Sequence, residues 1–135
     1  MDLGRSINEA IDYGQISGAY IQGLGWVTTE DLFYNEKGRL LSHSPTTYKI
    51  PNIQDTPRVF NIDLIENPHN KQNVRGSKAV GEPPFLLGLS AWTAIKEALL
   101  KARFPNRDQL PLLNLPATPH EIVRFLYENQ KEPSS

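Results

Sequence analysis

The glutamate at position 82 is the side chain whose surroundings best suit acid–base chemistry. It stands between Gly81 and the pair Pro83–Pro84, and three large apolar residues follow at positions 85–87. Proline fixes its own φ angle and biases the preceding residue toward an extended backbone, so we expect an extended, rigidly held Glu82. A general base needs a fixed position, and the apolar residues are expected to desolvate the carboxylate. The alternative interpretation is an ordinary polar turn with a solvated glutamate.

A glycine-rich helix is predicted over residues 7–30. Each glycine inside a helix costs about 1 kcal/mol relative to alanine, so this helix needs something packed tightly against it. That neighbour is either another backbone or a bulky ligand. Gln15 and Gln22 are spaced to share a face with Gly18 and could hydrogen-bond a polar, planar ligand. The four glycines of the helix are Gly14, Gly18, Gly23 and Gly25.

The remaining patterns predict an α+β fold. It would combine the glycine-rich N-terminal helix with a small, mostly antiparallel sheet and two C-terminal helices. A hairpin is expected over residues 31–43, a β-prone stretch over 46–51, and a half-buried strand where Phe60, Ile62 and Leu64 alternate with polar residues. Loops are expected over residues 75–87 and 104–117, and helices over 90–103 and from Pro119 onward, after a Thr118 cap.

Composition limits the class of protein. The 135 residues fit one domain, expected over residues 1–130 with a frayed tail over 131–135. The 14 basic and 15 acidic residues leave no basic surface for nucleic acid or an anionic membrane. There is no cysteine and no metal-ligand spacing among the three histidines, so this chain is not expected to supply metal ligands. Without a signal peptide or a long apolar run, the expected location is the cytoplasm.

Four segments together resemble the xanthine dehydrogenase and aldehyde oxidase family. They lie in the family's order and at similar separations, and the resemblance runs from about Ser6 to Tyr127. The segments are GQISGAYIQGLG at residues 14–25, TYKIP at 47–51, SKAVGEPP at 77–84 and PATP at 116–119. The resemblance implies the C-terminal portion of a molybdopterin-binding domain.

The resemblance also implies a reaction and roles for residues. The family hydroxylates a carbon at a molybdenum–pterin centre, and the segment from Ser44 to Pro51 looks nearer to xanthine dehydrogenases, which oxidise hypoxanthine and xanthine to urate. By resemblance, Glu82 is the general base that deprotonates the molybdenum-bound hydroxyl. Gln15 contacts the cofactor by the same resemblance. Ser77, Lys78 and Gly81 are further cofactor-binding candidates, because they adjoin or belong to the loop around Glu82 that meets the cofactor in the family.

The family's other cofactors and domains lie outside this chain. The resemblance implies 2Fe-2S and FAD domains or subunits and the remainder of the molybdenum domain as partners, with a purine as substrate. We therefore expect the chain to be inactive alone and to self-associate through apolar surface meant for its neighbours. Two alternatives stay open: a non-catalytic folding or interaction module, and an aldehyde-oxidising relative.

Overall fold

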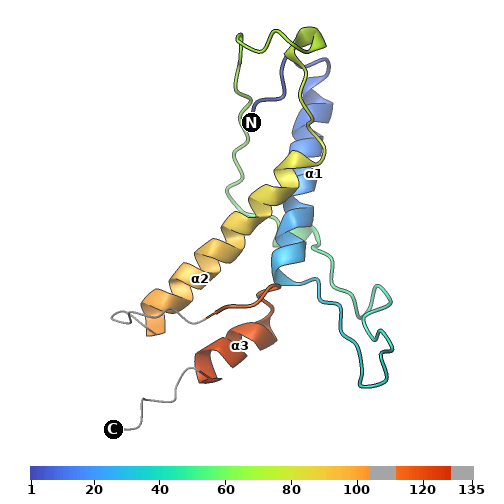
Figure 1. The fold of residues 1–135 in the computed structure, drawn as a ribbon, viewed down its shortest axis with the longest axis vertical. Coiled ribbons are helices and arrows are strands. Elements are labelled where there is room, and N and C mark those ends of the chain that lie inside the picture. The colour runs from blue at the N-terminus through green and yellow to red at the C-terminus, as the bar shows by residue number, and fades with distance from the viewer. Residues whose placement is uncertain (104–111, 129–135) are drawn as a thin grey trace.

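The part of the chain that the structure describes contains three α-helices and three short 3-10 helices (Figure 1). The computed structural model describes residues 1–103 and 112–128. The elements are α1 (Glu9–Thr28), η1 (Ile53–Asp55), η2 (Val74–Gly76), η3 (Pro83–Gly88), α2 (Leu89–Arg103) and α3 (Pro119–Glu128). None of the helices in these two ranges is long and apolar enough to span a membrane. The expected tail at 131–135 lies outside the described residues.

The predicted glycine-rich helix is confirmed as α1. It begins after Asn8, whose side chain accepts a hydrogen bond from the Ile11 amide at 3.3 Å, and Glu9 and Asp12 add negative charge in the first turn, where the helix dipole favours it. The helix ends at Thr28, where the Thr29 amide still donates to the Gly25 carbonyl at 2.9 Å.

Two glycines allow α1 and η3 to approach at the level of their backbones. A Cβ added to Gly23 would overlap the carbonyl oxygen of Phe85 and lie 3.0 Å from its carbon. A Cβ added to Gly88 would lie 2.8 Å from the Cα of Gly23. The interpretation of close backbone packing is therefore correct for Gly23. Since α2 follows η3 without a break, this contact also fixes where α2 leaves α1 (Figure 1).

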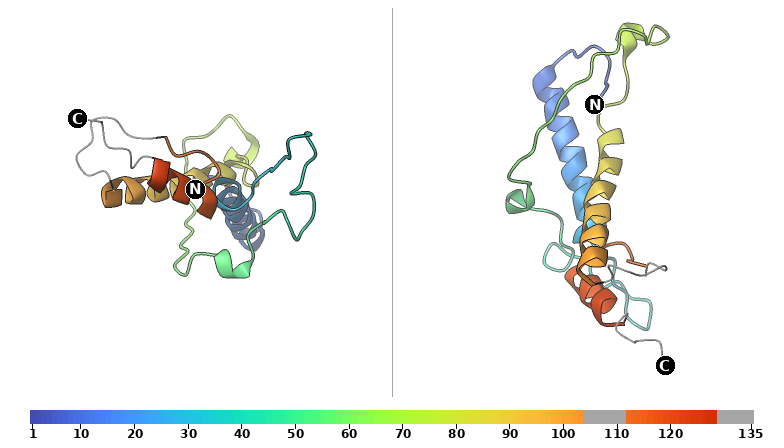
Figure 2. Two further views of the ribbon diagram at one scale, coloured as in Figure 1. Left: turned by 90° about the horizontal axis from the view of Figure 1, so that it is seen from below. Right: turned by 90° about the vertical axis from the view of Figure 1, so that its left-hand side faces the viewer.

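The small core lies where α3 meets α2 (Figure 2). Phe125 and Leu113 are fully buried there, together with Ala117. The predicted Thr118 cap is confirmed, because its hydroxyl accepts a hydrogen bond from the Glu121 amide at 3.2 Å. Ala117 donates its amide to the Val27 carbonyl at 2.8 Å, which ties this layer to the end of α1.

The predicted small antiparallel sheet, and with it the α+β class, is wrong. The residues that the structure describes contain no strand, only an isolated antiparallel bridge between Tyr34 and Leu40. The expected hairpin over 31–43 forms its turn, in which the Asn35 amide donates to the Arg39 carbonyl at 3.0 Å, but it does not extend into strands. A two-stranded ribbon without a packed face is marginal, and Phe33 and Tyr34 are exposed here.

The predicted strand around residues 60–64 is an extended segment without a ladder. It runs along α1, and the Phe60 ring lies 5.1 Å from the ring of Tyr20 (Figure 1). Its backbone hydrogen bonds within the described residues are two bonds with Met1. The alternating pattern predicted a half-buried face correctly, but a sheet also needs a neighbouring backbone, and a single sequence pattern does not supply one.

The predicted loop over residues 75–87 is also partly wrong, because its second half is η3. Glu82 precedes this helix with φ −88° and ψ −41°, which is helical and not extended. Pro83 and Pro84 occupy the first helical positions, where the missing amide hydrogens have no intrahelical role. The Phe85 amide then donates to the Glu82 carbonyl at 3.0 Å and closes the turn.

Candidate functional site

Glu82 lies at the start of η3 with its side chain exposed. Pro84, two residues later, is fully buried, so its packing holds the turn in place. The turn therefore holds the Glu82 backbone rigidly while its carboxylate faces outward. This arrangement suits a group that accepts a proton from a bound molecule.

The apolar residues after Glu82 do not cover its carboxylate in the described part of the chain. The Phe85 ring packs on Trp26 of α1, with 5.4 Å between ring centroids. Leu86 and Leu87 are 62% and 55% exposed. The expected desolvation of Glu82 is therefore absent from the surroundings that this chain supplies, and any cover must come from another part of the protein.

Gln15 is close to the Glu82 turn. Its amide oxygen would lie 3.2 Å from a Cβ built on Gly81, the residue directly before Glu82. Gln15 itself is an exposed residue on α1. The structure thus brings together two sites that are 66 positions apart in the sequence, the amide of Gln15 and the backbone next to Glu82.

Lys78 forms an ion pair with Asp2. Its ammonium forms an ion pair with the Asp2 carboxylate, and its backbone amide donates to the Leu3 carbonyl at 3.0 Å. Hydrogen bonds from Lys78 and from the Asn67 side chain lower the pKa of Asp2 to about 2. The Lys78 charge therefore fastens the N-terminal residues to this loop. Asp2 was not predicted as a site residue, because no local pattern indicates a partner so far along the sequence.

Ser77 follows a tightly built turn at η2. Arg75 and Gly76 both have positive φ angles, 56° and 63°. The side chain of Asn73 donates to the Ser77 carbonyl at 3.0 Å, and a Cβ on Gly4 would lie 2.9 Å from the Ser77 Cα. The Ser77 backbone is therefore held on both sides, whereas its side chain is exposed.

The face of α1 next to Gln15 is open. A Cβ on Gly14 or on Gly18 would meet no other atom within 4 Å among the described residues, in contrast to Gly23. Gln22 is exposed on the same helix. No group of three or more His, Cys, Asp or Glu side chains in residues 1–103 and 112–128 could hold a metal ion. A planar, polar group with its own metal ligands fits this face, because glycine lets it approach closely and glutamine can hydrogen-bond it.

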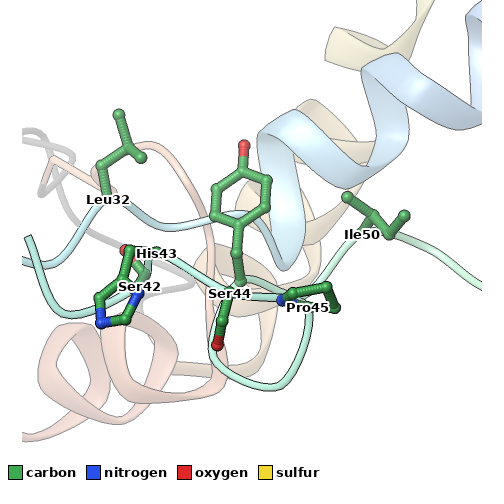
Figure 3. A pocket seen from close by; sticks show the side chains of 7 residues that line it. Leu32, Ser42, His43, Ser44, Pro45 and Ile50 are labelled. Atoms are coloured by element: carbon green, nitrogen blue, oxygen red, sulfur yellow. The ribbon is translucent and has the colours of Figure 1, made fainter.

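Two surface depressions lie away from these residues. One of about 410 Å³ is formed by the loop after α1, where Leu32, His43 and Ile50 surround it (Figure 3). Beside it, Tyr48 donates its hydroxyl to Glu30 at 2.6 Å, which raises the pKa of Tyr48. The other depression, about 440 Å³, lies between α1 and the segment around Phe60. Neither of these two depressions is lined by Gln15 or Glu82, and both of those residues are exposed.

Comparisons with known proteins define the class. A family model described as the molybdopterin cofactor-binding domain matches residues 1–57. The crystal structure of quinoline 2-oxidoreductase from Pseudomonas putida 86 superposes with a TM-score of 0.75 at 28% identity, covering 94% of this chain and 15% of that chain. Reconstituted CO dehydrogenase from Oligotropha carboxidovorans gives a TM-score of 0.69 at 22% identity and covers 92% of this chain and 15% of its own, which shows the fold alone. The fold is that of a molybdopterin-binding part of a larger protein.

Curated relatives narrow the class to one family. Xanthine dehydrogenase/oxidase of Felis catus is 47% identical over 126 residues, which are 90% of this chain and 10% of that protein. Xanthine dehydrogenase of Drosophila subobscura is 52% identical over 103 residues, 76% of this chain and 8% of that protein. The chain belongs to the xanthine dehydrogenase family. It spans about a tenth of the length of these relatives.

Proposed function

We propose that this chain is the C-terminal portion of the molybdopterin-binding part of a cytoplasmic molybdenum hydroxylase that oxidises hypoxanthine and xanthine to urate. In this proposal Glu82 is the general base. The observation that carries it is the placement of the Gln15 amide beside Gly81, because it joins the open face of α1 to the turn that holds Glu82. Relatives named as xanthine dehydrogenases support the purine substrate.

This proposal gives each site residue a role. The molybdenum–pterin group, when bound, supplies the two-electron oxidation of the substrate carbon. Gly14 and Gly18 would leave room for it, and the Gln15 amide would hold it by hydrogen bonding. Ser77, Lys78 and Gly81 would belong to the loop that meets it, and the main chain at Ser77 and Gly81 would present its polar groups there. The Lys78 ammonium contributes indirectly, by holding that loop to Asp2.

Glu82 accepts and passes on a proton in this scheme. Its carboxylate is exposed on a turn that is fixed by a buried proline. Proton transfer by a positioned side chain typically contributes about 10²–10⁴-fold to a rate. The remainder of the molybdenum domain is expected to cover the carboxylate and exclude water. The 2Fe-2S and FAD groups belong to further domains or subunits, so the chain alone is expected to be inactive.

Reconstitution tests this function. The chain is combined with the part of the Felis catus enzyme outside the matched region, and xanthine oxidation and molybdopterin content are measured together. Glu82→Gln should lower kcat by at least about 10²-fold at unchanged cofactor content, whereas Glu36→Gln, in an exposed turn, should have no effect. Full activity of the Glu82→Gln complex would favour the non-catalytic module. A complex that turns over an aldehyde but not xanthine would refute the purine substrate.

A further inference from the structure

The extended segment at residues 60–66 has one covered face and one exposed face. Phe60, Ile62 and Leu64 are half-buried, and Phe60 packs on Tyr20 of α1. The alternate residues Asn61, Asp63 and Ile65 are exposed. This alternation of period two is that of a strand lying on a helix.

The two hydrogen bonds with Met1 show how this segment would pair. The Met1 amine donates to the Asp63 carbonyl at 2.6 Å, and the Ile65 amide donates to the Met1 carbonyl at 2.8 Å. Two bonds from one residue to the positions on either side of Leu64 are the pattern of a parallel strand pair. Met1 therefore lies where the last residue of a parallel neighbouring strand would lie.

This geometry identifies the edge of the segment whose backbone amides are unpaired in the described residues. Backbone groups alternate along an extended chain, so those of Asn61 and Asp63 face the same side as Met1, and those of Ile62 and Leu64 face the other side. Among the described residues, no backbone group pairs with the Asn61 or Asp63 amide. An unpaired edge of this kind is a template for another extended chain.

A depression with a mixed polar and apolar lining lies beside the same edge, where Met1, Asn61 and Asp63 line it. It has a volume of about 440 Å³, and residues of α1, η3 and α2 line it together with Met1 and the segment. Its lining residues include Ile16 and Tyr20 of α1, Phe60 and Ile62 of the segment, and Leu87 of η3. A chain paired with the edge would point alternate side chains into this depression.

We propose that this edge binds a β-strand from the remainder of the molybdopterin-binding part. This strand runs parallel to residues 60–63, and its last residue lies next to Met1. Its alternate side chains, which are apolar, enter the depression. The identity of the partner rests on the proposed function. A large partner is expected because the chain spans about a tenth of its relatives. A second copy fits less well, because two identical edges related by a two-fold axis pair antiparallel, whereas Met1 sets a parallel direction.

Residue-resolved amide hydrogen exchange tests this proposal. The probe is the part of the Felis catus enzyme outside the matched region, bound to this chain. The amides of Asn61 and Asp63 should exchange at least about 100-fold more slowly in the complex than in the chain alone. Asn61→Pro, which removes a donor on the vacant edge, should weaken the complex at least about tenfold. Glu66→Pro is the matched control, since its amide faces the opposite edge and its side chain is exposed.

The outcomes separate this inference from the proposed function. A complex in which both amides still exchange at the rate of the free chain, or equal binding by Asn61→Pro and the unmodified chain, overturns the strand and leaves the proposed function standing. Failure to form any complex refutes the partner and the strand together. Protection that rises with the concentration of the chain alone assigns the edge to a second copy and also overturns the proposal.

Discussion

Two glycines of α1 that look equivalent in the sequence should respond oppositely to alanine. At Gly23, a Cβ would overlap the Phe85 carbonyl oxygen, which belongs to the backbone of η3 and cannot rotate away. At Gly18, a Cβ would meet nothing within 4 Å in the described part of the chain. Both positions lie inside α1, so both gain the same helix propensity from alanine.

The expected magnitudes follow from these two environments. Alanine in place of a helical glycine stabilises by about 1 kcal/mol, and this full gain is expected for Gly18→Ala. Overpacking a close contact costs about 1–3 kcal/mol, and a backbone atom as the neighbour places Gly23→Ala at the upper end. Its net effect is therefore a loss of roughly 2 kcal/mol. The two variants should differ by about 3 kcal/mol in the free energy of unfolding.

Urea unfolding followed by helical circular dichroism measures this difference. In a thermal scan the same gap corresponds to roughly 10 °C for a chain of this length. Gly88→Ala is a second test, because its Cβ would lie 2.8 Å from the Gly23 Cα, and it should also destabilise. Gly23→Ala as stable as Gly18→Ala, or more so, would refute the close contact between α1 and η3.

Three further predictions follow from the site and the surface. In the reconstituted complex, Gly18→Ala should lower bound molybdopterin although it stabilises the free chain; unchanged cofactor content would exclude that face as the cofactor site. The pKa of Asp2 is lowered from 3.8 to about 2, so its stabilising effect is complete above about pH 4 and is lost as the pH falls through 2. The stability gap between the unmodified chain and Asp2→Asn should therefore close between pH 4 and 2, and a gap constant with pH would contradict the ion pair with Lys78. Exposed apolar residues such as Ile7, Ile53 and Val74 predict self-association of the isolated chain in sedimentation velocity, and a monomer at every concentration would contradict this.

Features that depend on neighbouring residues in the sequence could be predicted. The helix over Glu9–Thr28 and the Thr118 cap follow from periodicity and from local hydrogen bonds of polar side chains. The alternation around Phe60 correctly predicted the half-buried face, although the predicted strand is absent from the described residues. These features could be predicted because each is stabilised by contacts within a few residues or by a single neighbouring helix.

Features that depend on distant partners could not be predicted. The sheet was wrong because Asn61 and Asp63 have strand-like neighbours in sequence, but in the described residues no backbone group pairs with either amide and only the N-terminal amine of Met1 pairs with the Asp63 carbonyl. Glu82 is helical because Pro83 and Pro84 begin a helix, a choice that the local bias of proline toward extended neighbours does not reveal. The sequence also left both interpretations of the glycines open, and the structure separates Gly23, packed on a backbone, from the open Gly18.

The general-base role of Glu82 is tested most directly by a single-turnover measurement on the reconstituted complex. The rate at which xanthine reduces the molybdenum centre isolates the chemical step from electron transfer to the other cofactors. With molybdopterin content measured in the same sample, Glu82→Gln should reduce this rate by at least about 10²-fold, and Glu36→Gln should leave it unchanged. A rate in the Glu82→Gln complex equal to that of the unmodified complex would contradict the account.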